Sequence, residues 1–293
     1  MNKYQCYICI FIIGVISFSF LEIKQETPFP YDLSRPIVVT LPDTLREISG
    51  ITQIDSVTVA CVQDENGIVF IYNIKERTIK EQFTFHTNGD YEGITRVNNT
   101  LYVLRSDGTL FEISNYMSDN RKIKSFVTGI PASNNEGLCY DSTQNILLIG
   151  CKGKITKGKE LKDKRYIYGF NLGNKTLIKQ PLYTFDIKDI LSLNSTLPQR
   201  NNKKTGGATP AFKFSTSALC IHPRSNKLYL LSASDYLIFI INKNGNIDSV
   251  TFLNKFLFNK AEGITFLENG DMLITNEAGG VKATILKFQY KQK

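Results

Sequence analysis

The chain has only two histidines, His86 and His222, among its 293 residues. Zinc and iron sites that need three histidines are therefore excluded. The sequence also lacks a phosphate-binding P-loop, a glycine-rich dinucleotide turn and a nucleophile elbow, so it carries no signature of the enzyme classes built on them. After residue 25 no convincing stretch repeats its apolar residues with a helical period. These absences favour a β-rich fold without a familiar catalytic motif.

Cysteines beyond the first 25 residues number four: Cys61, Cys139, Cys151 and Cys220. Their spacing matches neither a metal site nor a small disulfide scaffold. Export would permit disulfides. However, each cysteine lies inside an apolar, strand-like run, and we therefore expect buried free thiols.

The N-terminal region begins with Lys3 and continues as an uncharged run of 18 residues, 4–21, rich in Ile, Phe and Val. A basic residue followed by an apolar run predicts a secretory signal peptide. The run is also just long enough to span a bilayer if it stays uncut. We therefore predict that residues 1–25 are a signal peptide or an N-terminal membrane anchor, that 26–35 are a linker, and that the protein is exported to the cell envelope, either periplasmic or membrane-anchored.

A short phrase, Glu-Gly followed by an aliphatic residue, occurs three times. We call the position of the glutamate in this phrase the glutamate station. Alignment on the phrase places the residue that follows the station at Gly50, Gly93, Gly137, Ala218 and Gly263. The steps between them are 43, 44, 81 and 45 residues. A period near 45 is typical of a β-propeller, in which each blade is a four-stranded antiparallel sheet. Short β-branched and aromatic runs bounded by turn residues support it. The sequence predicts an all-β fold, with one β-propeller domain at 36–293.

Ring closure follows from counting strands. The last repeat has three strands, and a spare strand at 36–42 precedes the first repeat. We expect residues 36–42 to form the outer strand of the last blade, which removes an exposed sheet edge. The count is then five blades. Six blades are the alternative, which needs a further blade inside the 81-residue repeat.

The extra length of the long repeat lies in two insertions, at 153–165 and 187–213. Residues 152–165 carry a net charge of +5 and residues 199–213 carry +4, whereas the whole chain carries +8. The positive charge of the protein is thus concentrated in these two insertions. This concentration of charge could serve to bind a partner, but solvated lysine-rich loops that bind no partner explain it equally well.

Propeller geometry converts the repeat into a predicted site. First strands line the central channel, and the loops that lead into them share a face with the ends of the second strands. At this mouth we predict metal ligands at Glu92, Glu136, Glu262, Glu65 and Glu277. On the same face we predict ligand-binding residues at Arg105, Lys152, Lys213, Ser217 and Asp90. Ser49 occupies the glutamate station of the first blade, as Ser217 does in the fourth.

Converging carboxylates repel one another, so they must share protons or bind a cation. Hard oxygen ligands favour Ca²⁺ or Mg²⁺. Basic insertions beside such a cation suit a small anionic ligand bridged by the metal. The alternative is structural: the glycine relieves crowding where strands converge, and the glutamate caps backbone N–H groups.

Several segments taken in order resemble a known family. These are REISG at 46–50, GDYEGI at 89–94, SALCIHP at 217–223 with LYLLS at 228–232, and AEGIT at 261–265. Together they are similar to the SdiA-regulated (YjiK/CarP-like) family of exported bacterial β-propellers over roughly residues 36–290. The resemblance implies an envelope-located propeller, linked in some members to calcium and distantly similar to β-propeller phytases. It brings no accepted reaction or set of catalytic residues.

The sequence therefore predicts an exported, calcium-binding propeller that recognises a small anionic ligand or an envelope partner at the channel mouth. The alternative is a metal-dependent hydrolase, a phosphoesterase or lactonase, in which Arg105, Lys152 or Lys213 holds the anion. A third reading is a scaffold whose basic loops dock an acidic partner or anionic lipid. Whether the protein is an enzyme stays open. A nucleic-acid partner is not expected, because no basic surface with stacking aromatics is evident.

Overall fold

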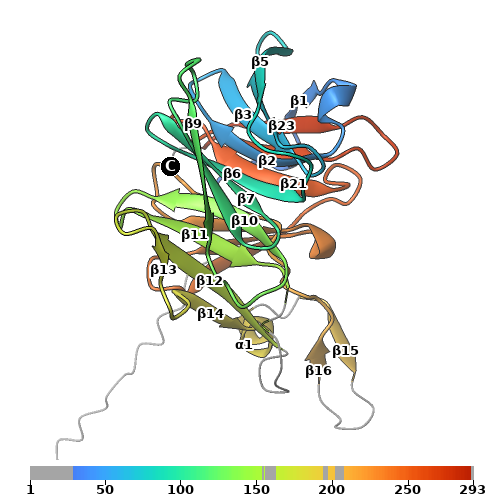
Figure 1. Ribbon diagram of the computed structural model, residues 1–293. Helices are drawn as coiled ribbons and strands as arrows, with labels where there is room; N and C mark the ends of the chain where they lie inside the picture. Colours follow the sequence, from blue (N-terminus) through green and yellow to red (C-terminus); the bar gives the residue numbers. More distant parts are fainter. Residues whose placement is uncertain (1–28, 154, 156–162, 194–196, 202–207, 292–293) are drawn as a thin grey trace, which may run out of the picture.

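The protein is described by a computed structural model that covers residues 29–153, 155, 163–193, 197–201 and 208–291. Five antiparallel sheets are arranged around a central axis, so the predicted five-bladed β-propeller is confirmed (Figure 1). The first strand of each blade is nearest the axis and contacts the first strands of both neighbouring blades.

The blades follow one another along the chain. Blade 1 contains β2 (Ile48–Gln53), β3 (Thr58–Gln63), β4 (Ile68–Asn73) and β5 (Thr78–Thr84), and blade 2 contains β6 (Tyr91–Val97), β7 (Thr100–Arg105), β8 (Thr109–Ser114) and β9 (Lys122–Val127). Blade 3 contains β10 (Asn135–Asp141), β11 (Ile146–Cys151), β12 (Lys164–Asn171), β13 (Thr176–Leu177) and β14 (Tyr183–Asp186). Blade 4 contains β17 (Ala218–Ile221), β18 (Leu228–Ser232), β19 (Leu237–Ile241) and β20 (Ile247–Phe252).

Blade 5 closes the ring as expected. Its inner strands are β21 (Ala261–Phe266), β22 (Met272–Asn276) and β23 (Thr284–Phe288), and its outer strand is β1 (Ile37–Thr40) from the beginning of the fold. The strands β1 and β23 are antiparallel, with Val39 opposite Ile285, and they lie side by side in Figure 1. The two ends of the propeller sequence are thereby hydrogen-bonded to each other.

Blade 3 and the insertion after it depart from the prediction in two places. The expected fourth strand at 176–185 is split into β13 and β14, which both pair with β12. Pro181 lies in the gap between them and has no N–H for a ladder hydrogen bond. The insertion 187–213, predicted as a loop, contains the helix α1 (Ile187–Leu193) and the hairpin β15 (Gln199–Asn201) and β16 (Ala208–Pro210). The helix α1 is too short to give a convincing helical period in the sequence, and its Ile187 and Ile190 are buried.

The core consists of five apolar clusters, one between each pair of neighbouring blades. This division follows from strands that are buried on both faces between adjacent sheets. All four cysteines beyond residue 25 are free thiols, as predicted. Cys61, Cys139 and Cys151 are buried, whereas Cys220 is partly exposed.

Contacts with the propeller begin upstream of residue 36. The side chain of Tyr31 is buried, and its hydroxyl donates to the carbonyl oxygen of Gly270 at 2.7 Å. Gly270 lies in the turn after β21, at the face opposite the starts of the first strands. In the described part of the chain no helix is long and apolar enough to cross a membrane. The predicted signal or anchor at 1–25 lies outside the described residues.

Candidate functional site

The glutamate station is a β-bulge. In four of the five blades the first strand has one extra residue relative to the second strand at this position. The extra residues are Ser49, Glu92, Glu136 and Glu262. A bulge re-aims the side chain of its extra residue, so the bulges explain why these side chains do not follow the strand alternation. In blade 4 the equivalent Ser217 precedes β17, and its backbone N–H donates to the Leu231 carbonyl at 2.8 Å.

The glycine after the bulge is required by the close approach of the neighbouring blade. A Cβ added at Gly93 would lie 2.8 Å from the Glu136 carbonyl oxygen and 2.8 Å from the Leu138 Cβ. A Cβ at Gly137 would meet Leu219 Cγ at 2.7 Å. The crowding explanation for the glycine is therefore supported, and it leaves the role of the acidic residue before it open.

Substitution of Gly93 by alanine is expected to destabilise the fold by about 1–3 kcal/mol, because the clash involves backbone that cannot rotate away. Urea unfolding measures the effect. Gly279→Ala is the matched control, since its Cβ would meet only Asn259 Nδ2 at 3.4 Å. Equal stability of Gly93→Ala and the wild type would contradict the close approach of blades 2 and 3.

Lys152 is the cation of the cluster. It follows β11 directly, and its Nζ lies 2.6 Å from Glu136 Oε1. The same Oε1 accepts a hydrogen bond of 3.1 Å from Asn134 Nδ2. The backbone N–H groups of Lys152 and Gly153 both donate to the Asn134 carbonyl, at 3.0 and 2.9 Å. This pair of contacts fixes the end of β11 against the start of β10 and holds the ammonium beside a carboxylate that is only 3% exposed.

The three glutamates of the station share one electrostatic environment. Burial, together with the charges of Glu136 and Asp90, raises the pKa of Glu92 to about 9. Burial raises the pKa of Glu136 to about 7, although Lys152 opposes the shift. Burial also raises the pKa of Glu262, against the charge of Lys152. Lys152 itself stays protonated, since its three glutamate neighbours outweigh the effect of burial and raise its pKa. At neutral pH this end of the channel therefore holds at least one proton on its carboxyl groups.

A second acidic group lies next to the first, between blades 5 and 1. Glu277 is ion-paired with Lys260. Burial, followed by the charges of Glu47, Glu277 and Glu65, raises the pKa of Asp64 to about 6. Lys260 also lies within electrostatic reach of Glu262. The two groups thus form one continuous set of charges along the rim of the channel.

Five buried carboxylate and amide oxygens at this end of the blades have no hydrogen-bond partner among the described residues. They are Asp64 Oδ1, Asn134 Oδ1, Asn135 Oδ1, Glu136 Oε2 and Asn276 Oδ1. Asn135 and Asn276 are at most 2% exposed. A carboxylate or amide oxygen without a donor in a buried position is costly. All five are acceptors, so the site is prepared for a group that supplies hydrogen-bond donors or positive charge.

The floor of the site is apolar. The residue after the glycine station is aliphatic in every blade, and all five side chains are buried: Ile51, Ile94, Leu138, Leu219 and Ile264. The same five residues line a cavity of about 170 Å³ that extends toward the opposite face past Thr52, Thr95, Cys139, Cys220 and Thr265. The charged mouth is consequently separated from the lower half of the channel by a ring of apolar side chains.

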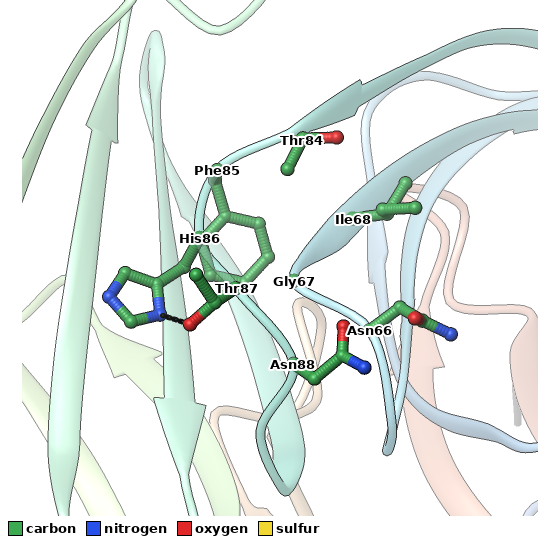
Figure 2. A pocket seen from close by; sticks show the side chains of 8 residues that line it. All are labelled: Asn66, Gly67, Ile68, Thr84, Phe85, His86, Thr87 and Asn88. Carbon is green, nitrogen blue, oxygen red and sulfur yellow. Dashed lines mark hydrogen bonds between the residues drawn. The ribbon is translucent and has the colours of Figure 1, made fainter.

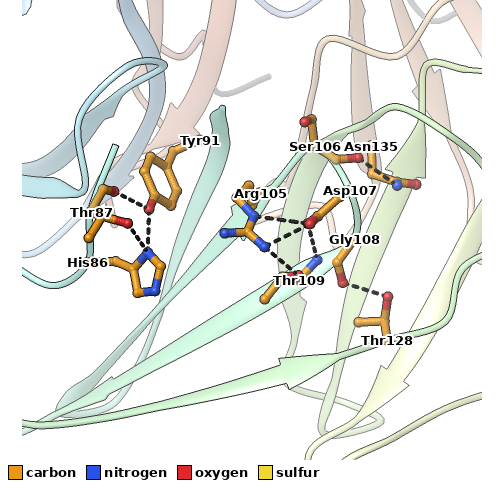
Figure 3. A network of polar contacts seen from close by, with 10 residues as sticks. All are labelled: His86, Thr87, Tyr91, Arg105, Ser106, Asp107, Gly108, Thr109, Thr128 and Asn135. Carbon is orange, nitrogen blue, oxygen red and sulfur yellow. Dashed lines mark hydrogen bonds and ion pairs between the residues drawn. The ribbon is translucent and has the colours of Figure 1, made fainter. Parts of the chain in front are cut away.

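Other predicted ligand residues lie outside this buried cluster. Arg105 donates to Asp107 at 2.8 Å and to Thr109 at 3.2 Å, and its hydrogen bonds hold the pKa of Asp107 at about 2 (Figure 3). Glu65, Asp90 and Lys213 are exposed. The structure thus brings Glu92, Glu136, Glu262, Lys152 and Ser217 together, with Glu277 in the adjacent group. Among the described residues no three His, Cys, Asp or Glu side chains lie close enough to hold a metal ion.

The network around Arg105 supports the mouth from outside. Asn135 Nδ2 donates to the Ser106 carbonyl at 3.0 Å, and Thr128 Oγ1 donates to the Gly108 carbonyl at 2.6 Å (Figure 3). The first bond ties the turn between β7 and β8 to the residue that precedes Glu136, and the second ties the same turn to Thr128 just after β9. A wide surface hollow of about 760 Å³ lies elsewhere, beside the β4 and β5 ends of blade 1, where His86 Nδ1 is 3.2 Å from Thr87 Oγ1 (Figure 2). This hollow does not include any of the clustered carboxylates.

Sequence reasoning missed Asn134 and Lys260. Asn134 lies two residues before Glu136, and Lys260 lies two residues before Glu262. Both contribute polar side chains to the mouth from the loop that leads into a first strand. The shared position two residues before the glutamate is a signal that was present in the sequence.

Comparisons with known proteins agree with the fold. No protein-family model and no curated protein matches the chain. The chain is similar in structure to glutaminyl cyclase from Myxococcus xanthus, with a TM-score of 0.56 and 12% identity over 89% of this chain and 98% of that one. A streptogramin B lyase has a TM-score of 0.47 and 12% identity, over 87% of this chain and 98% of that one. Virginiamycin B lyase from Staphylococcus aureus has a TM-score of 0.44 and 12% identity, over 86% and 73%. The likeness to the cyclase shows the propeller fold alone, and membership of the SdiA-regulated family stays a prediction.

Proposed function

We propose that the protein is an exported cell-envelope propeller whose channel mouth binds a small ligand or partner through the cluster of Glu92, Glu136, Glu262 and Lys152. The observation that carries the proposal is the convergence of one buried and two partly buried carboxyl groups from three blades on one lysine, with unpartnered acceptor oxygens around them. Gathering so many like charges away from water destabilises a fold, and such costly clusters occur preferentially at functional sites.

Ca²⁺ is the cation that we propose for this site, together with an anionic ligand. The donor set fits, because carboxylate and amide oxygens are the ligands that Ca²⁺ prefers. Glu92, Glu136 and Glu262 would hold the ion, with Glu277 and the amide oxygens of Asn134 or Asn276 nearby. The ammonium of Lys152 contacts Glu136 and would have to move, since calcium needs its oxygens gathered around one point. Displaced in this way, Lys152 becomes available to the anion.

Addition of Ca²⁺ is expected to raise the melting temperature of the protein, because a ligand that binds only the folded state stabilises it by mass action, by about 2.7 kcal/mol at 100 times Kd. The double variant Glu136→Gln with Glu262→Gln is expected to lose the rise. Glu268→Gln, on an exposed side chain at the opposite face, is the control and should keep it. An unchanged melting curve of the wild type in saturating Ca²⁺ would remove calcium from the proposal.

A metal-dependent hydrolase is the second candidate, and the raised pKa of the buried Glu136 beside Lys152 favours it. A carboxyl group with a pKa of about 7 can accept and return a proton near neutral pH. A panel of phosphoesters and lactones, assayed with Ca²⁺, Mg²⁺ or Mn²⁺, separates the two functions. Turnover that Glu136→Gln abolishes would support the hydrolase, and no turnover with any substrate and metal would leave the binding function.

Export is proposed from residues 4–21 and from the resemblance to the SdiA-regulated family. The first described residues lie at the face opposite the mouth, where Tyr31 packs against Phe266 and Tyr229. A retained anchor would therefore leave the charged mouth facing away from the membrane. Cell fractionation with N-terminal sequencing tests the location, and a full-length protein found only in the cytoplasm would contradict it.

A further inference from the structure

Glu136 and Asn134 present a specific pair of unpartnered acceptors. Glu136 Oε1 receives both available donors, Lys152 Nζ at 2.6 Å and Asn134 Nδ2 at 3.1 Å. The second carboxyl oxygen, Oε2, has no partner in the part of the chain that the structure describes, and neither has Asn134 Oδ1. Asn134 Oδ1 belongs to the amide that contacts Glu136, so both unpartnered oxygens lie on one hydrogen-bonded pair of side chains. Both oxygens are covered by neighbouring atoms, and Glu136 is only 3% exposed.

The group that fits such a pair of acceptors is an organic ammonium. An ammonium carries three N–H donors and binds separate acceptors one at a time through hydrogen bonds. A calcium ion needs six to eight oxygens at about 2.3–2.6 Å around one point. Across the described ranges no three acidic side chains are gathered in that way. The number and type of acceptors therefore match an ammonium, which reaches them once the side chains that cover them move aside.

Lys152 supplies a positive charge on the other oxygen of the same Glu136 carboxyl group. Its side chain is 35% exposed, so part of it faces solvent at the mouth while its Nζ contacts Glu136. An ammonium has more donors than that one contact uses, so a carboxylate entering from solvent can bind there. A ligand with both charges adds no net charge to the cluster, so it does not disturb the balance between the glutamates and Lys152.

From this juxtaposition we infer that the ligand of the mouth is a small zwitterion, with a primary ammonium bound by Glu136 and Asn134 and a carboxylate bound by Lys152. Free amino acids and short peptides belong to this chemical class. The inference rests on the proposed binding function and names its ligand class. The short separation of Lys152 Nζ and the Glu136 carboxyl group requires the two charges of the ligand to be close together.

A spacing series tests the inference. Glycine, β-alanine and 4-aminobutyrate, with methylammonium chloride and sodium acetate as single-charge controls, are titrated at constant ionic strength and followed by calorimetry and thermal shift. At least one amino acid is expected to bind ten times more tightly than either control. If none of the three binds better than both controls, the inference is overturned.

Variants locate the binding. Glu136→Gln is expected to weaken the preferred amino acid at least tenfold, and Asn134→Ala at least threefold, whereas Glu268→Gln leaves it unchanged. If Glu136→Gln fails to fold, Asn134→Ala decides alone, and an unchanged affinity in that variant contradicts the site. A Ca²⁺ titration runs in parallel. Stabilisation by Ca²⁺ without amino-acid binding overturns the zwitterion and keeps the proposed function, whereas no response to any ligand overturns both.

Discussion

Replacing Lys152 with methionine is expected to destabilise the protein by about 2–4 kcal/mol at pH 7.5. The change removes the ammonium that lies 2.6 Å from Glu136 and leaves that buried carboxyl group without its cation. Breaking a buried ion pair on one side typically costs 3–5 kcal/mol, and the partial exposure of Lys152 reduces the figure. Urea unfolding at pH 7.5 measures the loss. The loss should shrink at pH 5.5, where Glu136 takes up a proton instead.

The double variant Lys152→Met with Glu136→Gln separates charge from packing. Removing both members of the pair leaves no buried charge between them, so most of the lost stability should return. Lys188→Met is the control, because Lys188 is 67% exposed and its ion pair with Asp163 spans 3.4 Å, a surface pair worth little. A Lys152→Met protein within 0.5 kcal/mol of the wild type would show that Lys152 is not the counter-charge of the mouth.

Much of the architecture could be predicted because the propeller repeats itself. A glycine stands at this position in four of the five blades, at 50, 93, 137 and 263, where neighbouring residues approach closely, so the repeat in the sequence reflects a repeated contact. The spare strand before the first blade predicted ring closure in the same way. The helix α1 and the split at Pro181 were missed because both belong to the one repeat that has no counterpart for comparison. Local deviations in a single copy carry no periodic signal.

The site could be predicted only in part, for a different physical reason. The repeat placed three glutamates and Lys152 at one face, and the structure brings these four together. The contact between Lys152 and Glu136 depends on a bulge, which breaks the alternation of side chains along a strand. The alternation of side chains along a strand therefore does not predict that Lys152 contacts Glu136. For this reason the sequence predicted an anion ligand for Lys152 but not its contact with Glu136.

Raising the pH from 6.5 to 8.5 is expected to destabilise the protein by about 2–3 kcal/mol, mainly through Glu92. Burial and the neighbouring carboxylates raise its pKa from 4.5 to about 9 in the folded state. The folded protein thus holds a proton that the unfolded chain has released above pH 4.5. Stability from this group is complete below pH 4.5 and is lost as the pH rises toward 9. The melting temperature should therefore fall by roughly 5–10 °C over this interval.

Glu92→Gln isolates this contribution, because glutamine has the same shape and keeps no titrating proton. The variant should lose most of the pH dependence between 6.5 and 8.5 and be more stable than the wild type at pH 8.5. Glu136 titrates near pH 7 in the folded state and should account for the smaller remaining slope. Melting curves at five pH values in constant ionic strength give both slopes. Parallel curves for the variant and the wild type would mean that Glu92 is solvated and that the mouth does not concentrate negative charge. A shallower slope in the presence of Ca²⁺ would instead link proton release to cation binding, because a metal that takes the place of protons on shared carboxyl groups lowers the number of protons that the folded state holds.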